Sequence, residues 1–542
     1  MMLWTAPSVR TCFKNAVPQF GDSTCITLDA AKGEFVSMQI LVRNYCRFDI
    51  VNEPEIERKV MHITDGKIVQ TEGEKFDVSD VRIGAQEYHP FADGISYPDA
   101  ISANCIAEVD INTTQSIWVT FPVPYDQSAG AYKFHISMDS DSDEEIFADV
   151  ILKVYDVAIP TPDCGEYAME HFSTPGDLVL LQDAGYACTP YDEKWWEFME
   201  NYATSLKECR SNVYRISPLN ALMAAGSKRV AEDKWQFDFT YFNKLVDLLQ
   251  KSGVTKRFAI DDIMTSWGGT DVYAIGYNGE EITIDINNPE ADVWIKAYFT
   301  ALYDQILKHS SPDKWIMHIQ DEPRNAENWM RVSAYVKKYM PGLICGNPID
   351  EEEVENGLKD TIDLHIPIFH QVEENLEFYN TVVENPRKEI WAYCSCAPYS
   401  SWYLNRFIDR PVIHGRLIAW AAYSRGMQGF LHYGYSYWQK TKQFQSFGLD
   451  AHAQYKGDCM IIYPSPQNNS CKISARYINL RDGAQDYELL KIIEKADKEK
   501  ALELSKCIAE GYRNFNADEK HFTEVRSTLL KTAEKIRKGD LK

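Results

Sequence analysis

Eight short apolar runs alternate with stretches of helical periodicity between about residue 165 and residue 433, and this alternation constrains the fold most strongly. The runs expected to form strands are 167–172, 212–216, 257–260, 315–320, 343–345, 364–369, 389–394 and 429–433. Between them, one helical stretch repeats apolar residues at positions 195, 198, 199, 202 and 206, and another at 242, 245, 246 and 249 before Gly253, a C-cap residue type. Eight such units over about 280 residues predict a TIM-like (β/α)8 barrel, an α/β fold with its active site at the C-terminal strand ends.

The segment before the barrel has the period of two that is typical of antiparallel strands. Apolar residues alternate over 117–123, 132–138 and 150–154, and two prolines at 160 and 162 then form a stiff link. Beyond about residue 484 the pattern predicts two or three amphipathic helices. We therefore expect an all-β domain over 1–157, the catalytic barrel over 158–483, and a helical segment over 484–542 that packs on the barrel.

Charge and cysteine content exclude several classes of function. The net charge of -24 and the pI near 5.0 disfavour nucleic acid and anionic membranes as partners, so a neutral ligand fits better. No basic segment precedes an apolar run of signal-peptide type, and no stretch approaches 18 apolar residues, which predicts a cytoplasmic protein without a membrane anchor. The 13 cysteines include no CxxC pair, so we expect reduced thiols, no metal and no cofactor. The pattern makes no prediction of oligomeric state.

The fourth run carries the main candidate site, the adjacent acids Asp321 and Glu322. On a period of two, His318, Gln320 and Glu322 share one face, so Glu322 is predicted to point into the barrel mouth. Pro323 favours an extended backbone at Glu322. Asp321 has the opposite parity and reaches the cleft only if the chain twists or bulges. Acids at this position can also cap a helix, but the end of the fourth of eight strands favours function.

Glycoside hydrolysis is the chemistry that fits this pair best. It ordinarily requires two carboxyl groups, yet the seventh run, 389–398, has its one acid at the wrong end for a nucleophile. Substrate-assisted catalysis removes this need, because a 2-acetamido oxygen of the sugar can attack its own anomeric carbon. Glu322 would then act as general acid and base, while Asp321 would orient the acetamido N–H and stabilise the oxazolinium ion.

Aromatic and polar residues at strand ends are the candidates for substrate binding, since sugars stack their C–H faces on flat rings. The aromatic candidates are Trp267, Trp391, Tyr393, Trp402, Tyr433, Tyr435 and Trp438. We expect the Tyr393 hydroxyl to contact the acetamido oxygen. His370, Asn347, Asp261 and Asp262 follow strands and could bind sugar hydroxyls, although loop capping explains them equally well.

In these residues the chain resembles glycoside hydrolase family 123. It also resembles a wider group of proteins, defined by a domain of unknown function, that has the same catalytic barrel. The resemblance extends over nearly the whole chain. The matching strings are Gln320-Asp321-Glu322-Pro323, Gly429-Phe430-Leu431 leading to Trp438, Ala475-Arg476-Tyr477-Ile478-Asn479-Leu480-Arg481-Asp482-Gly483 followed by Asp486-Tyr487-Glu488-Leu489-Leu490, Gly33-Glu34-Phe35-Val36-Ser37-Met38-Gln39, and Tyr97-Pro98-Asp99.

The resemblance implies a β-sandwich joined to the barrel and a β-N-acetylgalactosaminidase that uses the acetamido group of its substrate. By the same resemblance, Asp321 matches the acetamido-orienting aspartate and Glu322 the acid/base. Family members are commonly exported glycan degraders, whereas this chain shows no signal, so a small imported oligosaccharide or glycoconjugate is the expected substrate. GalNAc follows from the resemblance and not from the spacing of residues.

Two alternatives remain open. The chain could be a carbohydrate-binding protein that kept the barrel and lost turnover, although binding alone does not need an acid pair at a strand end. It could also hydrolyse a sugar without an acetamido group, with Glu373 or Glu374 after the sixth strand as the second carboxylate.

Overall fold

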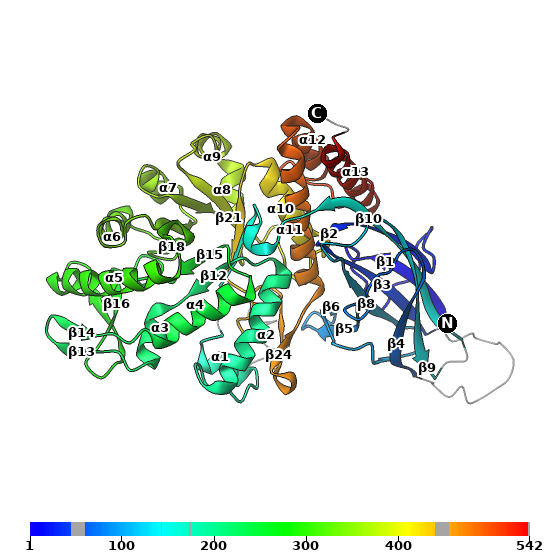
Figure 1. Ribbon diagram of the computed structural model, residues 1–542, viewed down its shortest axis with the longest axis horizontal. Helices are drawn as coiled ribbons and strands as arrows, with labels where there is room; N and C mark the ends of the chain where they lie inside the picture. Colours follow the sequence, from blue (N-terminus) through cyan, green and yellow to red (C-terminus); the bar gives the residue numbers. More distant parts are fainter. Residues whose placement is uncertain (45–59, 142–143, 173–174, 439–454, 540–542) are drawn as a thin grey trace.

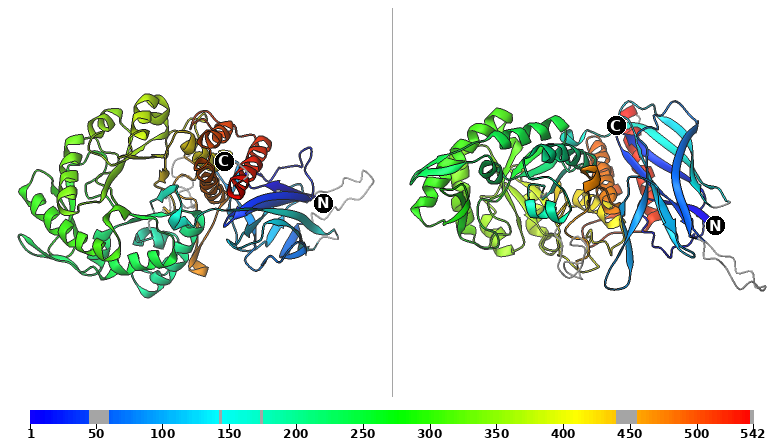
Figure 2. Two further views of the ribbon diagram at one scale, coloured as in Figure 1. Left: turned by 45° about the horizontal axis from the view of Figure 1, so that its top comes forward. Right: turned by 90° about the horizontal axis from the view of Figure 1, so that it is seen from below.

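The computed structural model describes residues 1–44, 60–141, 144–172, 175–438 and 455–539. A barrel and a β-sandwich lie side by side, and three C-terminal helices fill the space between them (Figure 1). The views in Figure 2 show the same arrangement, with the C-terminal helices between the barrel and the sandwich. This arrangement confirms the predicted fold class.

The sandwich consists of two five-stranded sheets. One has the order β1 (Met2–Pro7), β3 (Phe35–Arg43), β8 (Thr114–Pro122), β5 (Arg82–Pro90), β6 (Ser96–Ile101). The other has the order β2 (Cys25–Lys32), β10 (Ile146–Ala158), β9 (Gly130–Ser140), β4 (Met61–Glu72), β7 (Ala107–Val109). The predicted alternation holds in β9, which buries one face, whereas β8 is buried on both faces because Trp118 packs into the core shared with the barrel while Ile117 and Val119 pack inside the sandwich.

The barrel is closed by eight parallel strands, and each corresponds to one predicted run. In order they are β11 (Ala168–His171), β12 (Val213–Ile216), β15 (Arg257–Ile260), β18 (Trp315–Met317), β19 (Ile344–Ile349), β20 (Leu364–Pro367), β21 (Glu389–Tyr393) and β22 (Gly429–His432). The fourth strand is shorter than predicted and the fifth is longer. Apolar residues such as Ile316, Leu364 and Trp391 fill the interior below the mouth.

Helices surround the barrel as the periodicity predicts. They are α2 (Glu193–Cys209), α4 (Thr240–Ser252), α5 (Pro289–His309), α6 (Ala326–Tyr339), α7 (Glu352–Leu358), α8 (Phe369–Glu374), α9 (Leu376–Val383) and α10 (Ile413–Ser424). Gly253, with φ of 70°, ends α4 in the left-handed conformation expected of a C-cap glycine. The loops after the second and third strands add α3 (Pro218–Ala224) and the hairpins β13–β14 (Lys228–Ala231, Lys234–Gln236) and β16–β17 (Asp271–Ile275, Glu281–Asp285).

The C-terminal helices are α11 (Ala475–Glu494), α12 (Lys498–Ile508) and α13 (Glu519–Lys538). Every residue of α11 from Ala475 to Leu490 is buried, because the helix packs against α10 and α2 of the barrel and against β3 and β6 of the sandwich. The predicted boundary between 483 and 484 falls inside this helix, and the domain limits stay a prediction. In the part of the chain that the structure describes, no helix is long and apolar enough to cross a membrane.

A network of buried ion pairs, here called the junction cluster, connects the sandwich with α10, α11 and α13. Its members are Glu34, Arg416, Arg481, Asp482, Asp486 and Arg526. Arg526 contacts Glu34 at 2.8 Å and Asp486 at 2.9 Å, and Arg416 contacts the other oxygen of Asp486 at 2.7 Å. Nearby, Arg476 contacts Asp99 of the sandwich at 2.7 Å. The strings that carry the family resemblance outside the barrel mouth therefore meet one another at this junction.

Candidate active site

The end of the fourth strand is held by the loop that follows the third. The amide of Met264 donates to the Ile319 carbonyl at 2.9 Å, and the amide of Trp267 donates to the Asp321 carbonyl at 3.1 Å. The side-chain amide of Gln320 donates back to the carbonyls of Thr265 and Gly269 at 2.6 and 2.7 Å. These hydrogen bonds continue the pairing beyond Met317, where the regular ladder ends, and they position the two acids.

The backbone leaves strand geometry at the acid pair, with Glu322 at φ 43°. The expectation of an extended backbone at Glu322 was therefore wrong: Pro323 disfavours the right-handed helical region, and the chain here adopts the left-handed one instead. A non-glycine residue in this conformation is costly, and such strain persists where the surroundings impose it. On a regular strand, Asp321 and Glu322 would point to opposite faces. The turn lets both acids reach the mouth.

Glu322 lies beside Tyr393, whose hydroxyl donates to Oε1 at 2.7 Å. Burial raises the pKa of Glu322, and the Tyr393 hydroxyl and the guanidinium of Arg324, 3.9 Å away, offset only part of this effect. Burial and the charge of Glu322 also hold the pKa of Tyr393 well above its ordinary value, so the phenol stays a donor. Arg324 is itself anchored by Asp350, with Nη2 at 3.0 Å from Oδ2. Glu322 is thus a partly buried acid in a fixed position.

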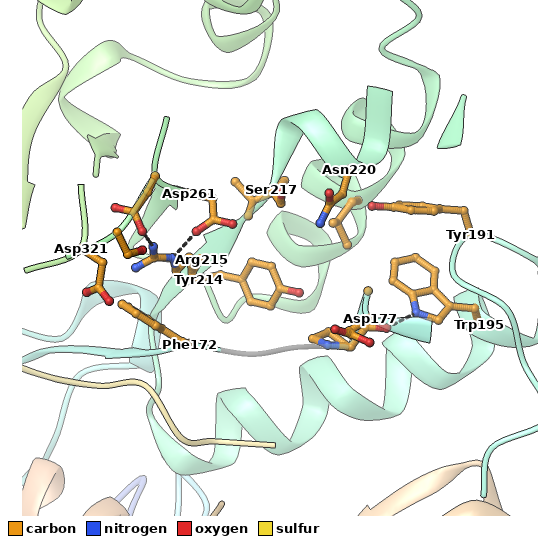
Figure 3. A pocket seen from close by; sticks show the side chains of 16 residues that line it. Phe172, Asp177, Tyr191, Trp195, Tyr214, Arg215, Ser217, Asn220, Asp261 and Asp321 are labelled. Atoms are coloured by element: carbon orange, nitrogen blue, oxygen red, sulfur yellow. Dashed lines mark hydrogen bonds and ion pairs between the residues drawn. The ribbon is translucent and has the colours of Figure 1, made fainter. Parts of the chain in front are cut away.

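Asp321 lines a pocket of about 340 Å³ formed by the loops after the first three strands (Figure 3). Burial and the neighbouring carboxylate of Asp262 raise the pKa of Asp321 to about 7, while Arg215 acts in the opposite direction. Its carboxylate oxygens accept no hydrogen bond from any residue that the structure describes. Asp321 therefore has both oxygens available for a ligand.

The other acids near the pair already have partners. Arg215 contacts Asp261 at 2.7 Å and also pairs with Asp262, and its guanidinium lies 3.6 Å from the ring centre of Phe172. Inside the barrel, Glu170 contacts His318 at 3.0 Å. Glu373, the candidate second carboxylate, pairs with Arg425 at 2.5 Å and accepts a hydrogen bond from the Tyr512 amide, and Glu374 is exposed in α8.

Two of the predicted aromatic residues, Trp267 and Trp402, are exposed, whereas Tyr393 is buried against Glu322. Tyr393 contacts Glu322, and its predicted acetamido contact stays a prediction. Trp267, with φ of 54°, follows the third strand and is 70% exposed, and Trp402, after the seventh strand, is 67% exposed. Tyr433 is half-buried and donates to Asp458 at 2.8 Å.

The structure does not bring Trp391 and Trp438 to the mouth, contrary to the expectation. Trp391 faces the barrel interior in the apolar layer below Tyr393, and its indole N–H donates to Glu389 at 2.8 Å. Trp438 is 1% exposed, stacks on Tyr186 with ring centres 5.4 Å apart, and donates to the Ile462 carbonyl. Both are core residues. A position near a strand end does not show how close to the barrel mouth the side chain lies. Tyr435, the remaining candidate, is also fully buried.

Asn347 has a positioning role instead of the expected sugar contact. It is fully buried, and its Oδ1 accepts hydrogen bonds from the Ile319 amide at 2.8 Å and from the Trp329 indole at 2.8 Å. Its side-chain amide donates to Asp262 at 3.2 Å. His370 lies in α8, half-buried, outside the residues that line the pocket.

Sequence reasoning missed Arg215 and Arg324. A signal for Arg215 was present, because an arginine in the middle of the apolar run 212–216, on the interior parity, needs an acidic partner. Among the described residues, no cluster of His, Cys, Asp or Glu could hold a metal ion, and the cysteines in those parts of the chain are all free thiols.

Known proteins share the fold of this chain. The family model described as glycoside hydrolase 123, catalytic domain, matches residues 183–493. A solved structure of a family 123 glycoside hydrolase from Clostridium perfringens, studied for glycolipid glycan hydrolysis, superposes with a TM-score of 0.74 at 15% identity, covering 99% of this chain and 98% of that one. A β-D-glucuronidase of Dictyoglomus thermophilum scores only 0.34 at 9% identity, covering 77% and 68%. No curated protein matches the chain.

Proposed function

We propose, from the premise that the chain belongs to glycoside hydrolase family 123, that it removes a β-linked N-acetylhexosamine by retaining, substrate-assisted catalysis. Membership makes the protein a glycoside hydrolase that acts on glycans. The substrate and the mechanism are our proposal, and the observation that carries it is the difference between the two adjacent acids. Glu322 is held by Tyr393, whereas the Asp321 carboxylate is open to a ligand.

In the first step, Glu322 donates its proton to the glycosidic oxygen while the acetamido oxygen attacks the anomeric carbon. The C–O bond to the leaving group breaks, and an oxazolinium ion forms. Asp321 accepts the acetamido N–H and stabilises the positive charge. In the second step, ionised Glu322 takes a proton from water, the water oxygen attacks the anomeric carbon, and the acetamido group is restored with overall retention. The raised pKa of Glu322 supports the first role.

The pairing of the neighbouring acids supports acetamido participation over a protein nucleophile. Asp261 and Asp262 are held by Arg215, Asp350 by Arg324, and Glu373 by Arg425 outside the mouth. An arginine-paired carboxylate is a weaker nucleophile than a free one. GalNAc as the sugar rests on the family resemblance, and the Clostridium perfringens relative is described as acting on glycolipid glycans.

The test is hydrolysis of aryl β-glycosides of GalNAc, GlcNAc, galactose and glucose, each with a poor and an activated leaving group. We expect turnover of acetamido sugars alone, and a β-configured initial product by proton NMR. Glu322→Gln should lose activity mainly on the poor leaving group, since an activated one needs no proton. Turnover of the galactoside or glucoside at a similar rate would refute acetamido participation.

A further inference from the structure

The pocket beside Asp321 reaches toward α1 (Leu178–Asp183) and α2, and its lining includes Asp321 but not Glu322. Figure 3 shows Asp321, Arg215 and Asp261 at one end, Tyr214 in the middle, and Asp177, Tyr191 and Trp195 at the other end. Because Glu322 serves the leaving group and Asp321 serves the sugar that is cleaved off, a pocket on the Asp321 side receives the glycone. This step rests on the proposed function.

Arg215 provides an observation that points to a ligand. Its side chain is 7% exposed, and Nε and Nη2 are engaged by Asp261 and Asp262. Its third donor, Nη1, has no hydrogen-bond acceptor among the described residues, and the nearest carboxylate oxygen, on Glu170, is 3.9 Å away. In Figure 3 the guanidinium is directed toward Asp321. A buried N–H group without an acceptor is costly, and because Nη1 is itself buried, a ligand oxygen would satisfy it only after neighbouring side chains shift.

The charges around the pocket define which ligand oxygen is suitable. Four carboxylates line it, those of Asp177, Asp261, Asp262 and Asp321, against the single guanidinium of Arg215. Asp261 and Asp262 already neutralise Arg215, so the pocket has a net negative charge. Hydroxyl groups can donate to carboxylates and accept from Arg215, whereas a sulfate or carboxylate would be repelled and would lose its hydration.

We propose that this pocket binds the glycone of a neutral glycan and rejects glycones that carry a sulfate or a carboxylate. Arg215 donates to a glycone hydroxyl, and the aspartates accept from the others. The apolar wall, which includes Phe172, Ile216 and Leu245, contacts the C–H face of the sugar. The excess of acids thus acts as a specificity device through repulsion of the wrong substrate.

The experiment compares aryl β-GalNAc with its 4-sulfate and 6-sulfate at low salt. We expect kcat/KM to favour the neutral substrate by about 100-fold, and the ratio to fall as salt is raised, because screening weakens charge repulsion but not steric exclusion. Asp261→Asn and Asp177→Asn should each lower the ratio of kcat/KM for the neutral substrate to kcat/KM for the sulfated substrate by several-fold. Asn still caps α1 at position 177, so this variant removes charge without removing the cap. Asp233→Asn, in the exposed turn of the β13–β14 hairpin, is the control for net charge.

Equal cleavage of sulfated and neutral substrates would overturn this inference and leave the proposed function intact. If no aryl glycoside is cleaved, the proposed function fails, and binding tests the pocket separately. Calorimetric titration of Glu322→Gln with the neutral disaccharide GalNAc-β-1,4-galactose and with a sulfated chondroitin disaccharide provides that measurement. Two results together support the pocket as assigned. Glu322→Gln should bind the neutral sugar more tightly than the sulfated one, and Glu322→Gln/Asp261→Asn should bind the neutral sugar more weakly than Glu322→Gln does. Equal binding, or no binding of either, contradicts it.

Discussion

The molecule contains two clusters of acids and arginines: the first has equal numbers of the two, and the second has more acids than arginines. The junction cluster has three acids, Glu34, Asp482 and Asp486, and three arginines, Arg416, Arg481 and Arg526. The barrel mouth places Asp261, Asp262 and Asp321 around Arg215, and Glu322 lies 3.9 Å from Arg324. Burial by itself raises the pKa of an acid.

The number of arginines around each acid makes the difference. At the junction, two arginines, Arg416 and Arg526, overcome the burial of Asp486 and lower its pKa below the ordinary value, whereas Arg526 alone does not offset burial at Glu34, whose pKa is raised. At the mouth, Arg215 does not offset burial and the charge of Asp262, and the pKa of Asp321 rises to about 7. The same residue types therefore stabilise one region and prepare the other for proton transfer and charge stabilisation. Substitutions should separate the two effects.

The largest effect is expected from Glu322→Gln. Loss of the general acid should lower kcat/KM on a poor leaving group by about 10²- to 10⁴-fold, with little change in the free energy of unfolding. Steady-state kinetics and urea denaturation measure the two quantities, and Glu377→Gln, exposed in α9, is the matched control. If Glu322→Gln loses stability in proportion to activity, Glu322 has a structural role like the acids of the junction cluster.

Asp486→Asn should produce the opposite result. Removal of this charge leaves Arg416 and Arg526 buried with too few partners, which should lower the free energy of unfolding by about 3–5 kcal/mol. Urea denaturation at pH 7 measures the loss, and kcat of the folded fraction should be unchanged. Asp304→Asn, exposed on α5, should leave both quantities as they are. An unaltered unfolding midpoint in Asp486→Asn would contradict the conclusion that the acids of the junction cluster stabilise the fold.

Asp321→Asn should stabilise the protein while it impairs catalysis. The folded pKa of Asp321, about 7, lies above its reference value of 3.8, so ionisation is penalised in the folded state, and stability falls as pH rises from about 4 to 7. Asparagine avoids this penalty. Since the side chain is partly exposed, we expect a gain of about 1–2 kcal/mol at pH 8 and no gain at pH 4. Thermal denaturation at both pH values tests this, and destabilisation at pH 8 would contradict it.

The smallest effect concerns the pH profile on an activated leaving group. Ionised Asp321 is needed to stabilise the oxazolinium ion, so kcat/KM should fall on the acidic side of about pH 7. The charge of Glu322 contributes to the raised pKa of Asp321. In Glu322→Gln the acidic limb should therefore move to lower pH, by less than about one unit. A shift to higher pH would mean that another group controls this limb.

The architecture was predictable because periodicity reports directly which residues face a core. All eight barrel strands were located from apolar runs, and the acid pair followed from its place after the fourth. The position of a side chain along the barrel axis was not predictable. Trp391 and Tyr393 share a face, yet Trp391 fills the interior and Tyr393 contacts Glu322. The positive φ of Glu322 was also hidden, since hydrogen bonds from the loop after the third strand impose it.

The string from Ala475 to Leu490 shows the converse limit. It supported the family resemblance most specifically, yet it indicated no chemistry. Its charged residues find their partners in the sandwich, 377 positions away for Arg476 and Asp99, and in α10 and α13, 70 and 40 positions away from Asp486. No local pattern encodes such pairings, and the structure alone reveals that the string serves the junction.

Helix α11 packs on the barrel through α10 and α2 and on the sandwich through β3 and β6, with almost its whole length buried. Neither part could be exchanged for a homologue from another protein without leaving arginines such as Arg476 and Arg526 facing the wrong surface. Gene recombination at the proline linker would therefore yield chimaeras that do not assemble. The sandwich and the barrel should be inherited as one evolutionary unit, whose substrate range changes through loop substitutions at the mouth instead of through module exchange.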